Sequence, residues 1–200
     1  IHFAAHHGLD EVVVSLCQKG IDLNCLNTRK ETPLLLAVKR NHVATINALL
    51  AEGADPNFLT TGRPLPLTHI ATLQNNAAAM LALFKAGVDI ESRSPKRLTP
   101  LHNAAFCGSC EAMLALLQLE ANVNSKSTIN GPVPLYLACE GGHHDAADLL
   151  LRWGADETAV DSDGKTIVTM MTHRISGAAV ASPPRLQRVC KLLARAPQDR

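Results

Sequence analysis

Aromatic residues are scarce in this chain. They make up 3% of 200 residues, with one Trp, one Tyr and four Phe. β-Sandwiches and barrels depend on aromatic and β-branched side chains, whereas alanine and leucine, which dominate here, favour helices. The composition therefore predicts an all-α or nearly all-α protein.

The chain also lacks a surplus of charge and a long apolar run. Its 19 Lys and Arg residues are balanced by 18 Asp and Glu residues, which leaves a net charge of +1. Binding to nucleic acid normally requires a clustered basic surplus, so no nucleic-acid partner is expected. Charged residues interrupt every apolar stretch before it reaches the roughly 20 residues that a bilayer-spanning helix needs. The sequence therefore predicts no membrane insertion.

Cysteines are few and scattered. Small secreted domains carry a dense framework of paired cysteines, and this spacing does not resemble one. The pattern predicts a reducing, intracellular location, most simply the cytoplasm. The six positions are Cys17, Cys25, Cys107, Cys110, Cys139 and Cys190.

A small residue recurs at a nearly constant interval. Five alanines are spaced 33 or 34 residues apart, at Ala4, Ala37, Ala71, Ala104 and Ala138. A second series keeps the same steps, at Gly20, Gly53, Gly87, Glu120 and Gly154. Two independent marks that agree on one period indicate a repeat protein.

A recognisable motif surrounds these marks. Residues 32–37 read TPLLLA, residues 99–104 read TPLHNA, and residues 53–57 read GADPN near the end of a unit. Looser copies of the first motif occur at residues 66–71, 134–138 and 166–168. These residues resemble the T-P-L-H-x-A signature of the ankyrin repeat family over essentially the whole chain. The resemblance implies an all-α solenoid of stacked helix-turn-helix units with finger-like hairpin loops.

The period predicts a single ankyrin-repeat domain spanning residues 1–200. Its six units are residues 1–27 (truncated), 28–60, 61–94, 95–127, 128–160 and 161–200. The first unit begins in the middle of the motif, so we expect the full protein to continue upstream of Ile1. The last unit carries about nine extra residues before a basic amphipathic segment at 185–195, which is typical of a degenerate terminal cap. Docking of this segment on a membrane or nucleic acid is the alternative.

Each unit is predicted to contain two helices. Thr32 and Thr99 are expected to cap the first helix, with proline at the first helical position. A left-handed turn should follow it at Gly8, Asn41, Asn75, Gly108 and Gly142. The second helix carries apolar residues three and four apart, at Val13/Leu16/Cys17, Ile46/Leu49/Leu50, Met80/Leu83/Phe84, Met113/Leu116/Leu117 and Ala147/Leu150/Leu151.

Glu120 is the one misfit in the glycine series. A residue other than glycine costs about 1–2 kcal/mol in the left-handed conformation. We therefore expect the second helix of that unit to end differently from the others.

Two segments invite a chemical interpretation. Residues 161–166 (DSDGKT) resemble part of a phosphate loop or a calcium loop, but Ala159 occupies the place of a required glycine and no acidic ligand follows at the calcium-loop spacing. Cys107 and Cys110 have the spacing of half a zinc site, without a second pair at a suitable distance. We expect a finger turn, and no cofactor, metal or catalytic residue.

Histidines occupy matching positions in several units. The resemblance implies that His102, the fourth residue of the signature, forms a hydrogen bond near the Thr99 cap, and that His2 and His69 have the same role. His42 and His143 stand at matching starts of second helices. A structural role is therefore expected for all five rings.

The resemblance implies that a partner protein binds the concave side, made of finger tips and the exposed ends of the first helices. The units differ most at these positions. The predicted protein-binding residues are Arg29, Glu31, Lys39, Arg40, Leu73, Gln74, Lys96, Leu98, Phe106, Cys107, Ile129, Asn130 and Glu140. We hypothesise that an acidic-rimmed hydrophobic segment lies along repeats two to four, with Phe106 and Leu73 at its apolar centre. Alternatively, Phe106 folds onto a neighbouring helix.

The sequence predicts a scaffold or adaptor that is not an enzyme. It should bind a protein partner, whose identity the sequence does not record, and should be monomeric as an isolated domain. The alternative is a regulatory or targeting domain of a larger enzyme or channel whose activity lies outside this segment. Catalysis by the stack itself would need a polar pocket with convergent titratable groups, and the sequence shows no such cluster.

Overall fold

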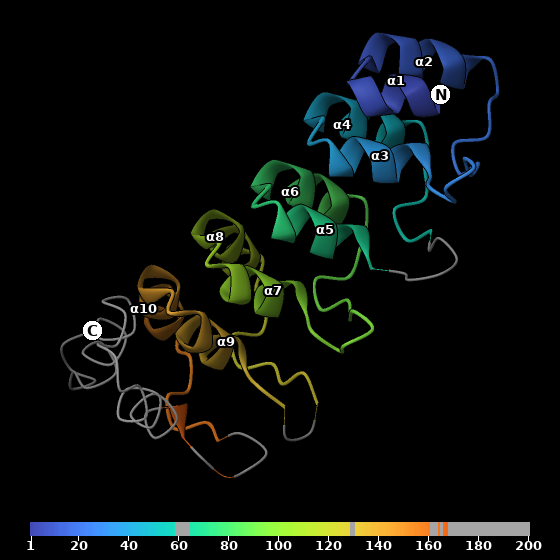
Figure 1. Ribbon diagram of the computed structural model, residues 1–200. Coiled ribbons are helices and arrows are strands. Elements are labelled where there is room, and N and C mark those ends of the chain that lie inside the picture. The colour runs from blue at the N-terminus through green and yellow to red at the C-terminus, as the bar shows by residue number, and fades with distance from the viewer. Residues whose placement is uncertain (59–64, 129–130, 161–163, 165, 168–200) are drawn as a thin grey trace, which may run out of the picture. The chain divides into compact units, whose positions relative to one another are not determined.

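The fold was analysed in a computed structural model that describes residues 1–58, 65–128, 131–160, 164, 166 and 167. These residues form ten helices and no strand, apart from one antiparallel bridge between Val160 and Thr166 (Figure 1). The first helices of the repeats are α1 (His2–His7), α3 (Pro33–Lys39), α5 (Leu67–Leu73), α7 (Pro100–Cys107) and α9 (Pro134–Gly141). The second helices are α2 (Asp10–Gln18), α4 (Val43–Ala51), α6 (Ala77–Lys85), α8 (Cys110–Gln118) and α10 (His144–Arg152). The all-α class is as the sequence predicts.

The chain forms two compact units, Ile1–Pro95 and Lys96–Arg200. In the first unit, α3 packs between α1 and α5, and α4 packs between α2 and α6. In the second unit, α7 packs against α9 and α8 against α10. Each unit therefore has a layer of first helices and a layer of second helices. The predicted terminal cap lies outside the described residues except for Gly164, Thr166 and Ile167.

Threonine side chains cap the beginnings of two first helices. The hydroxyl oxygen of Thr32 accepts from the amide of Leu35 at 3.1 Å, and that of Thr99 accepts from the amide of His102 at 3.4 Å. The ring of His102 donates from Nε2 to the carbonyl of Pro132 at 3.0 Å, so its Nδ1 accepts from Thr99. The predicted threonine caps and the role of His102 are confirmed.

His2 and His69 differ from His102 in one respect. The Nε2 of His69 donates to the carbonyl of Ser92 at 2.9 Å, and the Nε2 of His2 lies 3.0 Å from the carbonyl of Glu31. Both rings therefore tie a first helix to the finger loop that follows. The prediction of a threonine-cap partner was wrong for these two rings, because the N-cap residues of α1 and α5 are Ile1 and Pro66, which have no side-chain hydroxyl.

The turn between the two helices of each repeat is left-handed. All five predicted positions have positive φ angles: 72° at Gly8, 61° at Asn41, 53° at Asn75, 67° at Gly108 and 70° at Gly142. Glycine and asparagine adopt this conformation more readily than other residues. The predicted turn chemistry is confirmed.

Glu120 does not end its helix differently, so that expectation was wrong. Its φ angle is 64°, in the same region as the glycines at this position in the other repeats. The amide of Glu120 donates to the carbonyl of Leu117 and that of Ala121 donates to Leu116, both at 3.0 Å. Glu120 therefore keeps the hydrogen bonds that close the helix, and these offset a conformational cost of about 1–2 kcal/mol.

The core lies between the helix layers of each unit. The predicted stripe of the second helices supplies most of its large side chains, because the first two members of the stripe are buried in α4, α6, α8 and α10. The large side chains that are fully buried in the described residues are Leu34, Ile46, Leu49, Met80, Leu83, Leu101, Met113, Leu116, Leu135, Leu150 and Ile167. Each contributes roughly 1.5–3 kcal/mol by leaving water.

Neighbouring repeats are joined where the second helix begins. The Nε2 of His42 donates to the carbonyl of His6 at 3.0 Å, and that of His143 donates to Phe106 at 3.0 Å. Each ring lies over the turn of the preceding repeat, where a Cβ atom on Gly8 would be 2.6 Å from the first ring. A Cβ atom on Gly108 would be 2.5 Å from the second. Glycine is therefore required beneath each histidine.

The third repeat uses a different pair at the same junction. Its second helix begins after Asn76, and the preceding turn is Asn41 instead of glycine. The Asn76 amide donates to the side-chain oxygen of Asn41, and the Asn76 side-chain oxygen accepts from the amide of Ala79 at 2.9 Å. An asparagine pair thus replaces the pair of glycine and histidine.

Leu116→Ala should lower the free energy of unfolding by about 2–5 kcal/mol, because it leaves a cavity in a fully buried site. Urea unfolding followed by circular dichroism measures the loss. The control is Leu114→Ala on the same helix, where the side chain is 40% exposed and the loss should stay near half a kcal/mol. Equal losses would contradict the assignment of faces.

Gly108→Ala should destabilise the chain by at least about 1 kcal/mol more than Gly154→Ala. Both glycines have positive φ angles, but only Gly108 faces a ring, and Gly154 has open space around it. Urea unfolding measures both variants. In a His143→Ala background the two costs should become similar, and a difference that persisted there would contradict the role of the ring.

Candidate protein-binding surface

The first unit brings together the ends of α1, α3 and α5. The side-chain amide of Gln74, after α5, donates to the carbonyl of Lys39 at 2.7 Å, which ties two predicted binding positions together. Arg40 is exposed, and Leu73 is 46% exposed. The pKa of His6 is lowered by partial burial and by the positive charge of Arg40. The cationic character of this surface therefore comes from Arg40 instead of His6.

Lys39 and Glu31 form an ion pair. The Lys39 Nζ lies 2.6 Å from a carboxylate oxygen of Glu31. This hydrogen bond lowers the pKa of Glu31 against the opposing effect of burial. Two predicted binding residues thus neutralise one another, which leaves Arg29 and Arg40 as the exposed cations of the predicted set in this unit.

Asn27 shapes the finger tip that carries Arg29 and Glu31. Its side-chain oxygen accepts from the amide of Arg29 at 2.8 Å and from that of Glu31 at 2.9 Å. Lys30, between them, has a φ angle of 58°. The tip is thus a closed turn that presents Arg29 to solvent and directs Glu31 toward Lys39.

Phe106 is the exposed apolar residue at the end of α7 in the second unit. Its side chain is 55% exposed, so it does not fold onto a neighbouring helix. Its carbonyl accepts the hydrogen bond from His143, which fixes the backbone from which the ring projects. Cys107 follows it and is also exposed.

The remaining predicted residues are less uniform. Glu140 at the end of α9 is half-buried, and so is Leu98 in the finger before α7. Lys96 in the same finger is exposed. Ile129 and Asn130 lie outside the described residues. The exposure needed for binding is therefore met most fully by Phe106, Leu73, Arg29, Arg40, Lys96 and Cys107.

Phe3 was missed in the sequence. It is 71% exposed on α1, and its ring centroid lies 4.4 Å from that of His7. The repeat period places Phe3 level with Leu36, which is only 8% exposed because α3 has a first helix on each side.

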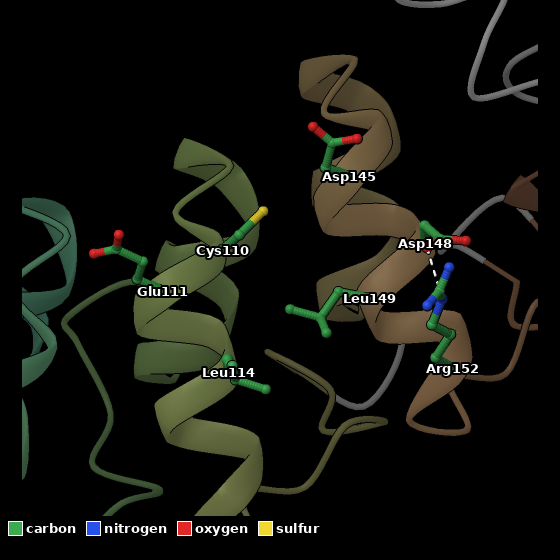
Figure 2. A pocket seen from close by; sticks show the side chains of 7 residues that line it. All are labelled: Cys110, Glu111, Leu114, Asp145, Asp148, Leu149 and Arg152. Carbon is green, nitrogen blue, oxygen red and sulfur yellow. Dashed lines mark ion pairs between the residues drawn. The ribbon is translucent and has the colours of Figure 1, made fainter.

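A groove between α8 and α10 was also missed (Figure 2). Its volume is about 350 Å³, and its lining residues are Cys110, Glu111, Leu114, Asp145, Asp148, Leu149 and Arg152. Four of the seven lining residues are charged, and Leu114 and Leu149 supply its apolar surface. The sequence contained one indication of this groove. Each of the two helices has an apolar residue outside its predicted stripe, Leu114 in α8 and Leu149 in α10.

The described residues give little support for a metal site or for a reactive thiol. No group of three or more His, Cys, Asp or Glu residues there could hold a metal ion. Burial raises the pKa of the Cys107 thiol, and burial together with the charge of Asp145 raises that of Cys110. A raised pKa disfavours the thiolate, which is the form that binds metals and attacks electrophiles.

Comparisons with known proteins identify the fold. The family model described as ankyrin repeats (3 copies) matches residues 1–94 and 68–161. The crystal structure of the ankyrin repeat domain of Bcl-3 superposes with a TM-score of 0.82 at 26% identity, covering 97% of this chain and 84% of that one. The chain therefore belongs to the ankyrin repeat family.

Curated relatives are much longer proteins. Rabankyrin-5 of Mus musculus is 30% identical over 160 residues, which cover 78% of this chain and 13% of the relative. Glycerophosphocholine phosphodiesterase gde1 of Schizosaccharomyces pombe is 31% identical over 145 residues, which cover 72% of this chain and 13% of the relative. The chain thus spans about one eighth of either protein. Ankyrin repeats are generally protein-interaction modules, and the fold is typically non-catalytic.

None of the helices in the described residues is long and apolar enough to cross a membrane. The helices run from 6 to 9 residues, whereas a span needs about 20.

Lys39→Met should raise the pKa of Glu31 toward its ordinary value, because the ion pair and hydrogen bond are lost. A carboxyl whose folded pKa is lowered stabilises the fold above its unfolded pKa, and this contribution disappears as pH falls through the folded value. The Lys39 side chain is 44% exposed, although that of Glu31 is only 14% exposed, so at neutral pH the variant should lose only about 0.2–1 kcal/mol. An NMR titration of the Glu31 carboxyl measures the pKa.

Arg29→Met is the matched control for Lys39→Met. Arg29 acts on Glu31 only through a weak charge interaction, so its removal should raise the pKa less. An equal rise in the two variants would show that nearby positive charge in general, and not the ion pair with Lys39, lowers the pKa of Glu31.

Proposed function

We propose that this chain is a non-catalytic binding module that holds a partner protein against the exposed ends of its first helices. The observation that carries the proposal is the exposure of Phe106 on a backbone pinned by His143. Aromatic residues on a rigid support are common centres of protein interfaces, because they bury a large area at little cost in conformational entropy.

The two units differ in the residues that they expose at the ends of their first helices. In the first unit Leu73 supplies an apolar contact beside Arg40 and Arg29. In the second unit Phe106 lies in the same register, with Glu140 on the next first helix. A partner should therefore offer apolar side chains to Leu73 and carboxylates to the arginines at the first unit, and apolar side chains to Phe106 at the second. Such a partner would present both acidic and hydrophobic residues.

We further propose that the module acts inside the cell, binds neither nucleic acid nor the membrane interior, and is monomeric in isolation. The scattered cysteines and the balanced charge support this proposal. A second possibility is that the module regulates or targets a larger enzyme. It is favoured by relatives such as the phosphodiesterase gde1, in which the matching segment is a small fraction of the protein.

Phe106→Ser and Leu73→Ser should each weaken partner binding by about tenfold or more, because each removes an exposed apolar anchor. Partners captured from cell extract by the wild-type chain can be identified by mass spectrometry, and their affinities can be measured with purified proteins. Circular dichroism should be unchanged, since both side chains are about half exposed.

Leu119→Ser is the control for these two variants. Leu119 is an exposed leucine at the end of α8, in the layer of second helices, and its replacement should leave binding unchanged. Full affinity in both Phe106→Ser and Leu73→Ser would reject the proposed surface.

A further inference from the structure

The groove between α8 and α10 lies in the layer of second helices. Figure 2 shows Leu114 of α8 and Leu149 of α10 pointing into the space between the two helices. Leu114 is 40% exposed and Leu149 is half-buried. A volume of about 350 Å³ is enough to receive apolar side chains from another molecule.

Leu149 is larger than its counterparts in the other repeats. The equivalent residue, sixth in each second helix, is small in the other four repeats: Ser15, Ala48, Ala82 and Ala115. The helices of those repeats pack with no larger group at this position. The additional side chain of Leu149 instead provides apolar surface on one side of the groove.

Carboxylates surround this apolar surface. Glu111 and Asp145 are each the second residue of their helix, and Asp148 lies one turn beyond Asp145. Asp148 is paired with Arg152 at 2.8 Å, whereas the Asp145 side chain is 92% exposed. The groove lining thus holds three carboxylates and one guanidinium, which gives it a negative surplus.

Both α8 and α10 carry a carboxylate at their second residue, whereas in the first unit only α2 does so, at Glu11. The second residues of α4 and α6 are Ala44 and Ala78. Burial, and secondly the charge of Asp145, raises the pKa of Cys110 at the end of the groove.

We propose that the groove is a second docking site, whose occupant is a basic amphipathic helix of a partner protein. The helix would insert leucine-type side chains between Leu114 and Leu149 and place Lys or Arg beside Asp145 and Glu111. Binding of an amphipathic helix through residues at i, i+3, i+4 and i+7 is a common mode of recognition in grooves. The complementary charge determines that the helix is basic.

A fluorescent synthetic helix of about 18 residues, with leucine at i, i+3, i+4 and i+7 and lysine elsewhere, is the probe. Fluorescence anisotropy measures its binding to the full chain. Leu114→Ser and Asp145→Lys should each raise the dissociation constant about tenfold or more. Peptides with Ser in place of Leu, or Glu in place of Lys, should not bind.

Glu11→Lys is the matched control, because Glu11 is the second residue of α2 and is exposed like Asp145. It should change the dissociation constant less than about twofold. Phe106→Ser should likewise leave binding unchanged, which separates this site from the first-helix surface. An equal loss in Glu11→Lys, binding of the Ser peptide, or no binding of the Leu and Lys peptide would overturn the proposal.

Residues 185–195 of the chain also have basic and apolar faces and are the competing occupant. If they held the groove, the double variant Arg188→Glu and Lys191→Glu would bind the probe about tenfold more tightly. That result would overturn a partner bound in trans. Unchanged binding in this variant is the outcome that we expect.

Discussion

Mutual burial between neighbouring helix pairs is the constraint on which the rest of the structure depends. The helices have 6 to 9 residues, too few to be stable alone in water. The alanines that mark the repeat are almost fully buried, because each lies where adjacent helices approach most closely. With a larger residue there, the helices would separate and the leucines behind them would return to water. The exposed residues at the helix ends are positioned only while that contact holds.

The repeat period, the helix caps and the turns could all be predicted from the sequence. They follow from local rules, since each threonine caps an amide only three residues ahead, Thr32 that of Leu35 and Thr99 that of His102. Glu120 shows where a local rule fails. The preference for glycine at its position is worth only about 1–2 kcal/mol. The hydrogen bonds of Glu120 and Ala121 and the stacking of the repeat outweigh that preference.

The candidate surfaces were predicted less completely, because exposure depends on neighbours that are distant in sequence. The register placed Phe106 and Leu73 at solvent-facing positions, and both are exposed. It could not reveal that Lys39 is paired with Glu31, since the two residues are eight positions apart, at opposite ends of α3. The register also could not reveal the groove. There Leu149, at a position that is small in the other repeats, lies opposite Leu114 of the preceding repeat. Only coordinates bring such pairs together.

The junction between repeats has a consequence for how such a chain can change over time. A second helix that starts after histidine needs a predecessor whose turn lacks a side chain, as at Gly8 and Gly108. A second helix that starts after Asn76 is matched instead by Asn41. Modules of one kind therefore cannot be duplicated, deleted or shuffled next to modules of the other without a compensating exchange. The order of the repeats is therefore constrained by matched pairs of residues that lie about one period apart.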